Sequence, residues 1–327
     1  MIPTNPRRRR RRLAVACLIA VSAAVGCSSS SGSGWPRQAD TSTRPATPSQ
    51  DAHAKAVPGK PEQDPAERAA AEARAAVEAE AARAEAERVA RTAREAAARK
   101  WGLATPPLAA PAPPVTKPVL VDNGQHVIVR PGLPPVVRRV PTTDKVVFLT
   151  IDDGAEKDPD FSRMLRELNV PVSAFVSDYL ARTDYGYFRD LEAHGVAINN
   201  HTLNHKDLRK LGGDALQREV CGQQDSLEKQ IGVRPKLFRP PYGEYTAEAL
   251  SIARSCGVTA VPLWNEEAFP DRIEYRYGDH KLQSGDIILT HFRGTDTWKG
   301  TMADMLRRVL REVTDQGFAL ARLEDYL

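Results

Sequence analysis

Short apolar runs alternate with amphipathic stretches through the C-terminal two thirds of the chain. After two short entry strands at 119–121 and 126–129, the apolar runs predict strands at 146–151, 172–176, 196–199, 236–238, 258–263, 286–290 and 318–320. Helical spacing of apolar residues predicts helices at 161–168, 187–194, 214–231, 247–256 and 302–316. Repeated strand–helix units indicate an α/β domain with a parallel sheet and helices outside it.

The same alternation fits an open sheet or a sheet closed into a barrel. An open, doubly wound sheet would be expected to have a glycine-rich phosphate turn after its first strand. The first long strand is instead followed by Asp152-Asp153-Gly154, and no such turn is present.

The N-terminal segment, residues 1–26, has the pattern of an export signal. Six arginines, Arg7 to Arg12, precede an apolar run from Leu13 to Val25 that is shorter than the ~20 residues of a membrane span. The ending Ala24-Val25-Gly26-Cys27 resembles a bacterial lipobox, which implies cleavage before Cys27 and a lipid on its thiol. Ordinary signal cleavage without a lipid is the alternative, and the sequence leaves Sec or twin-arginine export open.

Composition divides the rest of the chain into four parts. Residues 27–64 are mostly Ser, Gly, Thr, Pro and Ala, with too few large apolar side chains for a core, and are expected to be a disordered tether. Residues 65–101 are dense in Ala, Glu and Arg and predict a solvated spacer helix, preferred to a coiled coil because Val77 and Val89 are its only large aliphatic residues. A proline-rich linker at 102–118 leads to one globular domain at 119–327.

The charge of the mature chain argues against nucleic-acid binding. The whole chain has a formal charge of +4, but residues 1–26 carry six arginines and no acidic residue, so the exported chain would have −2. Its expected partners are an extracellular polysaccharide and, through the lipid, a membrane, and we expect a monomer.

Polar residues with chemical potential follow the predicted strands. Because the C-terminal ends of strands converge on one face of a β/α barrel, these residues are expected to share a site. They are Asp152 and Asp153 after 146–151, His201 and His205 after 196–199, Arg239 to Gly243 after 236–238, Trp264 after 258–263 and His291 after 286–290. Asp-Gly after a strand is also common turn chemistry, so the position of Asp153 is informative only together with the others.

Two of these clusters predict a metal site. His201 and His205 are four residues apart, which places both imidazoles on one side of a helical turn. Together with a carboxylate they form a two-histidine, one-carboxylate site that lowers the pKa of water and polarises a carbonyl. Zinc is the expected ion, and Co²⁺, Ni²⁺ and Mn²⁺ also fit these ligands.

The remaining clusters predict acid–base and oxyanion groups. Two prolines fix the path of Arg239-Pro240-Pro241-Tyr242-Gly243, so the amide of Tyr242 can be aimed at a developing oxyanion, and Arg239 can hold a carboxylate. His291 ends an apolar strand, where it could protonate a leaving amine.

Taken together, Thr150 to Gly154, His201 to His205, Arg239 to Gly243 and Leu289-Thr290-His291 resemble the successive motifs of the polysaccharide deacetylases, carbohydrate esterase family 4. The resemblance covers about residues 144–327 and implies a distorted barrel of about seven β/α units. It also implies a role for each matching residue: Asp153, His201 and His205 as metal ligands, Asp152 as the general base, Arg239 as its orienting partner, the Tyr242 amide as an oxyanion donor, His291 as the general acid, and Trp264, Pro241 and Leu289 as substrate-binding residues.

The sequence departs from the family pattern in two places. Ile151 replaces a phenylalanine, an apolar exchange expected to be nearly neutral. After Trp264 the family has an Asp-Trp element, whereas this chain reads Asn265 to Asp271. Glu267 or Asp271 could supply the missing charge and Phe269 the missing aromatic wall.

Four cysteines are present. Cys17 is removed with the signal and Cys27 is the lipidation site, so Cys221 and Cys256 remain on helices of consecutive units. An exported protein is in an oxidising environment, which favours a disulfide between them, with two small buried apolar residues as the alternative.

These features predict a metal-dependent hydrolase that removes N-acetyl groups from an extracellular polysaccharide, on the outer face of the bacterial cytoplasmic membrane. Peptidoglycan is the first candidate, and chitin-like oligomers and O-acetylated polysaccharides remain open. A different class of answer is a non-catalytic wall-binding lipoprotein, motivated by the altered stretch after Trp264. An intracellular sugar-nucleotide enzyme is disfavoured by the signal and the absent phosphate turn.

Overall fold

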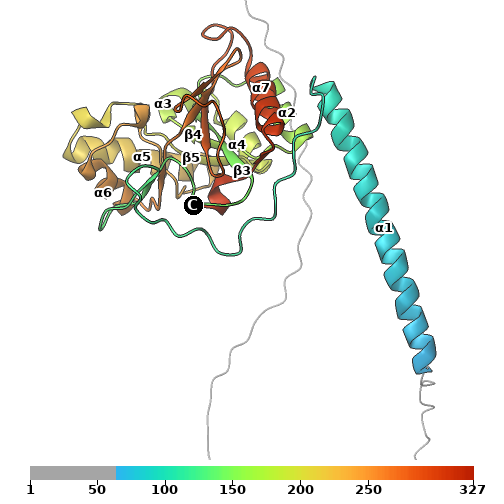
Figure 1. Cartoon of the computed structure of the whole chain (residues 1–327). Helices are drawn as coiled ribbons and strands as arrows, with labels where there is room; N and C mark the ends of the chain where they lie inside the picture. The colour runs from blue at the N-terminus through green and yellow to red at the C-terminus, as the bar shows by residue number, and fades with distance from the viewer. Residues whose placement is uncertain (1–63) are drawn as a thin grey trace, which may run out of the picture. The chain divides into compact units, whose positions relative to one another are not determined.

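The computed structural model describes residues 64–327 (Figure 1). The signal, most of the predicted tether and Cys27 therefore lie outside the described residues. The described part begins with helix α1 (Pro65–Lys100), which occupies the stretch predicted as the spacer helix. Asp64 caps it by accepting the N–H of Ala66 at 2.9 Å.

Only the C-terminal end of α1 contacts the α/β domain. Lys100 and the indole N–H of Trp101 both bind the Glu167 carboxylate, at 2.6 and 2.7 Å, and Arg307 donates to the carbonyl of Trp101 at 2.7 Å. The side chains along the rest of α1 are almost all exposed. Among residues 64–327, none of the helices has both the length and the apolar character that a membrane span requires.

The α/β class predicted from the sequence is confirmed. The larger sheet has the order β5-β4-β3-β9-β7-β8, with β10 beside the start of β3, and the smaller one has the order β1-β2-β6. The parallel strands of the larger sheet are β3 (Val146–Asp153), β4 (Ser173–Val176), β5 (Ala197–Asn200), β7 (Glu266–Ala268), β9 (Ile287–His291) and β10 (Ala319–Leu320). Its last strand, β8 (Ile273–Tyr275), is antiparallel to β7. The smaller sheet contains β1 (Val127–Ile128), β2 (Val136–Val137) and β6 (Val261–Pro262).

Isolated bridges connect the two sheets. Asn200 at the end of β5 bridges to Phe238, Leu237 bridges to Ala260 beside β6, and Arg139 after β2 bridges to Asp286 before β9. The strands thus follow one another around a ring in which some neighbours share a single bridge instead of a continuous ladder.

Some strand predictions need correction. Residues 236–238 form isolated bridges but no strand of their own. Residues 119–121 form no strand, because Val119 and Val121 are exposed and have no strand beside them. Three strands were not predicted: β2, which lies in a proline-rich stretch, and β7 and β8, whose charged residues are unusual in strands.

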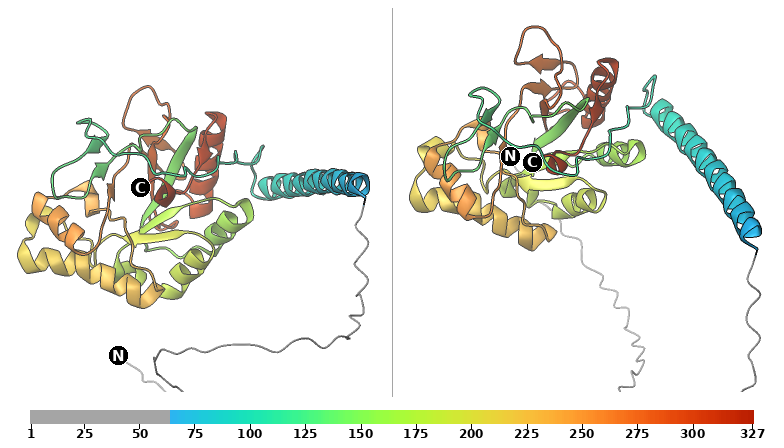
Figure 2. Two further views of the ribbon diagram at one scale, coloured as in Figure 1. Left: turned by 90° about the horizontal axis from the view of Figure 1, so that it is seen from below. Right: turned by 60° about the horizontal axis from the view of Figure 1, so that its bottom comes forward.

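Helices surround the strands (Figures 1 and 2). The five predicted helices are present as α2 (Pro159–Leu168), α4 (Tyr185–Ala193), α5 (Gly213–Ile231), α6 (Ala247–Ser255) and α7 (Met302–Asp315), and a short helix, α3 (Asp178–Ala181), was not predicted. A disulfide joins Cys221 on α5 to Cys256 at the end of α6, with 5.3 Å between the Cα atoms. It links the same two cysteines that the sequence analysis paired.

A buried polar cluster fixes β7 against the start of β9. Asp286 accepts hydrogen bonds from Arg139 at 2.6 Å, from the Asn265 side chain at 2.8 Å and from the backbone N–H of Gln283 at 2.6 Å. Burial and the neighbouring Asp286 charge raise the pKa of Glu266 to about 9. Glu266 is therefore a neutral acid at neutral pH, which allows two carboxyl groups to be buried side by side.

Replacing Glu266 by glutamine should make the protein more stable, increasingly so as the pH rises. The folded wild type keeps the Glu266 proton up to about pH 9, whereas the unfolded chain releases it near the ordinary value, so wild-type stability falls by up to about 1.4 kcal/mol per pH unit in between. Thermal unfolding of wild type and Glu266→Gln at pH 5, 6.5 and 8 measures this difference. Glu78→Gln on the exposed α1 is the control, and a pH-independent difference would contradict the assignment.

Candidate functional site

Two buried carboxylates end strand β3. Asp152 and Asp153 are each about 2% exposed, and Asp153 has a left-handed backbone with φ of 81°. Successive side chains of a regular strand point to opposite faces. The left-handed residue interrupts that alternation, so both carboxylates reach the same site: Asp152 lies 3.6 Å and Asp153 3.7 Å from Nε2 of His201.

His201 and His205 lie in an irregular loop after β5, so the predicted helical turn is wrong. Thr202 and His205 have positive φ angles of 71° and 53°. Side chains hold this shape: Asn200 accepts the N–H of Thr202 at 2.8 Å, and the Thr202 hydroxyl accepts the N–H of His205 at 3.0 Å. The imidazoles still converge, with 4.9 Å between their ring centres.

The protonation of His201 suits a metal ligand. Its Nδ1 lies 2.7 Å from the carbonyl oxygen of Arg239, which can only accept, so Nδ1 carries the proton and Nε2 presents a lone pair. Burial lowers the pKa of His201 to about 4, and burial together with His201 lowers the pKa of His205. One ligand atom from each of Asp153, His201 and His205 lies within 4.8 Å of the others, so these residues fit a divalent metal ion.

Arg239 is fully buried and holds Asp152. Its Nη1 donates to Asp152 at 2.7 Å and to the Thr150 hydroxyl at 2.9 Å, and its Nε donates to the carbonyl of Pro262 at 2.9 Å. The guanidinium also lies over the ring of Phe175, 4.3 Å from its centre. Burial raises the pKa of Asp152 and the charge of Arg239 opposes that rise.

The loop after Arg239 places Tyr242 beside the histidines. Tyr242 has a φ of 63°, and its ring packs edge-on against His205 with 4.8 Å between ring centres. Glycine suits position 243 because its φ of 70° is left-handed and a Cβ would approach the Trp264 ring to 3.0 Å. Of the predicted substrate-binding residues, Trp264 is half-buried under this loop, whereas Pro241 and Leu289 are buried and offer little surface.

His291 lies opposite Asp152, in register with it across the β3–β9 pair. Its Nδ1 is 3.4 Å from the carboxylate of Glu267 on the neighbouring strand β7. Asp271, the other candidate partner, instead pairs with Arg272 at 3.1 Å, and Phe269 packs against Trp298. Burial lowers the pKa of His291, against the charges of Asp152 and Asp153, and burial raises the pKa of Glu267.

The family model of the polysaccharide deacetylases matches residues 139–261, which include five of the residues that meet at this site: Asp152, Asp153, His201, His205 and Arg239. An uncharacterised protein of Streptomyces coelicolor is 42% identical over 196 residues, which are 60% of this chain and 78% of that protein. The chain belongs to the polysaccharide deacetylase family. Membership in this family and the Asp153-His201-His205 group identify the protein as a hydrolase.

Two further comparisons place this polysaccharide deacetylase among its relatives. A peptidoglycan-N-acetylglucosamine deacetylase of Bacillus cereus is 25% identical over 201 residues, which are 59% of this chain and 92% of that protein. The solved structure of a CE4 family pseudoenzyme from Bacillus anthracis matches with a TM-score of 0.51 and 18% identity, over 59% of this chain and 69% of that one. The second likeness shows the fold alone.

Arg293 is a residue of the deacetylase site that the sequence analysis missed. It follows His291 by two positions, and its Nη2 donates to the second carboxylate oxygen of Asp153 at 2.5 Å. The first oxygen of Asp153 remains directed toward His205, 3.3 Å from its Nε2. An arginine after a strand end does not by itself indicate a functional residue, so only the folded structure reveals the Arg293–Asp153 pair.

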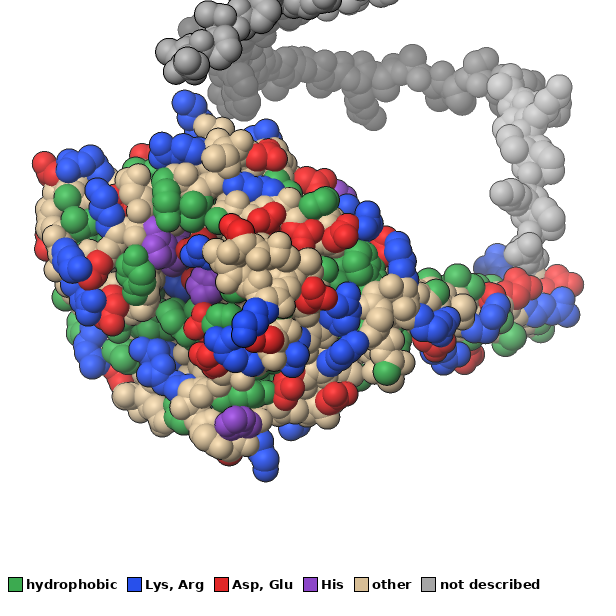
Figure 3. All heavy atoms as spheres, turned by 90° about the horizontal axis from the view of Figure 1, so that it is seen from above, with side chains coloured by type: hydrophobic (Ala, Val, Ile, Leu, Met, Phe, Trp, Pro, Cys, Tyr) green, Lys and Arg blue, Asp and Glu red, His purple; other side chains and the backbone are tan. Residues whose placement is uncertain are grey.

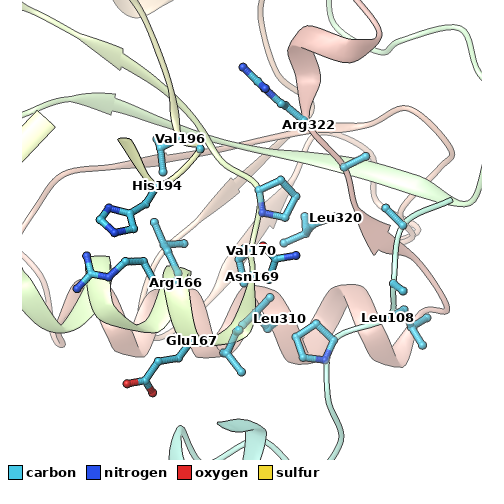
Figure 4. A pocket seen from close by; sticks show the side chains of 18 of the residues that line it. Leu108, Arg166, Glu167, Asn169, Val170, His194, Val196, Leu310, Leu320 and Arg322 are labelled. Carbon is cyan, nitrogen blue, oxygen red and sulfur yellow. The ribbon is translucent and has the colours of Figure 1, made fainter. Parts of the chain in front are cut away.

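A separate cavity of about 670 Å³ lies at the other ends of the strands (Figure 4). Val170 before β4 and Val196 before β5 line it, together with Leu108, Leu310 and Leu320. None of its lining residues belongs to the metal-ligand group.

We expect Arg293→Gln to weaken metal binding about 10- to 100-fold, because partners that orient metal ligands typically contribute that much. Arg293→Lys keeps the charge but loses the planar fork, and should fall between Gln and wild type. Zinc affinity is measured by competition with a chromophoric chelator. Arg272→Gln, whose guanidinium pairs with exposed carboxylates, is the matched control, and unchanged or tighter binding in Arg293→Gln would refute the role.

Proposed function

We propose that this protein is a metal-dependent hydrolase that removes N-acetyl groups from an extracellular polymer of acetylated amino sugars. Peptidoglycan is our first candidate, and chitin-like and O-acetylated polysaccharides undergo the same chemistry. One observation carries the proposal: an Asp152–Arg239 pair and a His291–Glu267 pair flank one Asp-His-His group, with Asp152 and His291 in register on neighbouring strands.

Asp153, His201 and His205 would hold the metal, with zinc as the expected ion and Co²⁺, Ni²⁺ or Mn²⁺ as alternatives. Such an ion polarises the acetyl carbonyl and lowers the pKa of water. The neutral imidazole of His201, with Nε2 free to bind, is the chemical form that a metal requires.

Asp152 is suited to take a proton from the attacking water. Burial makes its carboxylate more basic than an exposed aspartate, while the charge of Arg239 opposes that rise in pKa and its hydrogen bond fixes the carboxylate. The water oxygen adds to the acetyl carbon, and the amide of Tyr242 is the proposed donor to the resulting oxyanion.

His291 is suited to complete the reaction. As the C–N bond breaks, it would donate a proton to the departing amine, which leaves acetate and a free amino sugar. Glu267, 3.4 Å from its Nδ1, would orient the ring and stabilise its protonated form. In this proposal Glu267 takes the role of the aspartate that the sequence lacks after Trp264.

The location is also a proposal, and it rests on the sequence. The signal, the lipobox and Cys27 support export and a lipid anchor on the outer face of the bacterial cytoplasmic membrane. Helix α1 has 36 residues, about 54 Å of helix, which would help the domain to reach a wall polymer. We also infer a distorted β/α barrel of about seven units and a monomer.

The deciding assay measures acetate release from N-acetylglucosamine oligomers and from peptidoglycan. We expect the zinc-loaded protein to release acetate and a chelator to abolish the release. Asp152→Asn should lower kcat by about 10²- to 10⁴-fold, since it removes the general base, and His201→Ala should remove zinc binding together with activity.

The competing function is a wall-binding lipoprotein without catalysis. The likeness to a Bacillus anthracis pseudoenzyme gives a reason to test it, because fold similarity does not distinguish the two. If metal-loaded protein bound these glycans but released no acetate from any of them, the hydrolase proposal would be wrong.

A further inference from the structure

Two exposed tyrosines stand out in the α/β domain. From residue 122 to the C-terminus, Tyr179 and Tyr242 are the only large hydrophobic residues that are exposed, at 42% and 63%. Neither hydroxyl makes a hydrogen bond within residues 64–327, so no hydrogen bond of the fold accounts for these side chains. Exposed aromatic rings that gather at one place are typical of a binding surface.

Both tyrosines lie beside the metal-ligand loop. Tyr179 is the second residue of the short helix α3, which follows β4. Its backbone N–H donates to the carbonyl of Leu203, between the two histidines, at 2.9 Å. The neighbouring Ser177 hydroxyl donates to the carbonyl of His201 at 2.7 Å. Tyr179 is therefore tied to the His201–His205 loop from the β4 side.

Tyr242 lies on the other side of the same loop. Its ring contacts His205. It follows Phe238, which bridges to Asn200 at the edge of β5 that faces away from β4. It also lines a hollow of about 630 Å³ that runs from His205 past Lys206 and Arg209 to Glu244. Figure 3 shows a face on which histidine side chains lie in a recess next to hydrophobic and charged side chains.

The electrostatics agree with this placement of Tyr179. Burial raises the pKa of its hydroxyl, and the charge of Asp153 adds to that rise.

We propose that Tyr179 and Tyr242 are two sugar-stacking surfaces on either side of the His201–His205 loop, which bind different rings of one acetylated amino-sugar chain. A pyranose has an apolar face of C–H groups that packs on an aromatic ring while its hydroxyls stay hydrated. The hollow beside Tyr242 has room for the chain to continue. The inference rests on the proposed function and deepens it: the substrate is an oligomer that spans both tyrosines.

The test compares substrates of different length. The full chain, loaded with zinc, is assayed on N-acetylglucosamine oligomers of one to six units and on 4-nitrophenyl acetate, which cannot span the two tyrosines. For Tyr179→Ala we expect KM on the hexamer to rise about tenfold, with kcat within twofold and unchanged hydrolysis of the ester. Tyr179→Phe keeps the ring and should behave as wild type.

A control and a binding measurement separate this inference from the proposed function. Val119→Ala truncates an exposed apolar side chain of the entry segment and should leave hexamer KM unchanged. Calorimetric binding of the hexamer should weaken in Tyr179→Ala and in Tyr242→Ala even if no acetate were ever released, in which case only the hydrolase proposal would fail. Wild-type hexamer KM and affinity in Tyr179→Ala would overturn the inference, whatever the activity.

Discussion

The structure depends on pairing two adjacent buried carboxyl groups with cations at the end of a strand. Burying an unpaired carboxylate costs several kcal/mol, so each needs a cationic partner. Arg239 reaches Asp152 from the far side of the ring of strands, and Arg293 reaches Asp153 from the end of β9. Each carboxylate has its other oxygen directed toward Nε2 of His201, at 3.6 Å from Asp152 and 3.7 Å from Asp153.

The surrounding architecture is organised to deliver these partners. β3 lies between β4 and β9, and β5 is next to β4, so residues at the ends of β9 and β5 meet Asp152 and Asp153. Elsewhere some neighbouring strands share only a single bridge, and side-chain hydrogen bonds hold them together instead of a backbone ladder. The cluster of Arg139, Asn265 and Asp286 holds β7 in place in this way. That cluster sets the position of Glu267 and, through it, the orientation of His291.

Sequence reasoning located β3, the long helices and the residues that meet at the site, because buried strands and amphipathic helices have strong periodicity and the motifs recur at strand ends. It misjudged the His201–His205 turn, since a spacing of four is satisfied equally by a helix and by a loop with positive φ angles. It missed β7 because glutamates disfavour strands, and here burial keeps Glu266 protonated. Arg293, and the choice of Glu267 over Asp271, depend on tertiary contacts that no local pattern encodes.

The most direct measurement is anomalous X-ray diffraction at the zinc edge from crystals of the zinc-loaded protein. The account predicts one ion bound by Nε2 of His201, Nε2 of His205 and one oxygen of Asp153, at about 2.0 to 2.2 Å from each, with Arg293 on the other oxygen. An ion bound elsewhere, or an ion that lacks Asp153 as a ligand, would contradict it.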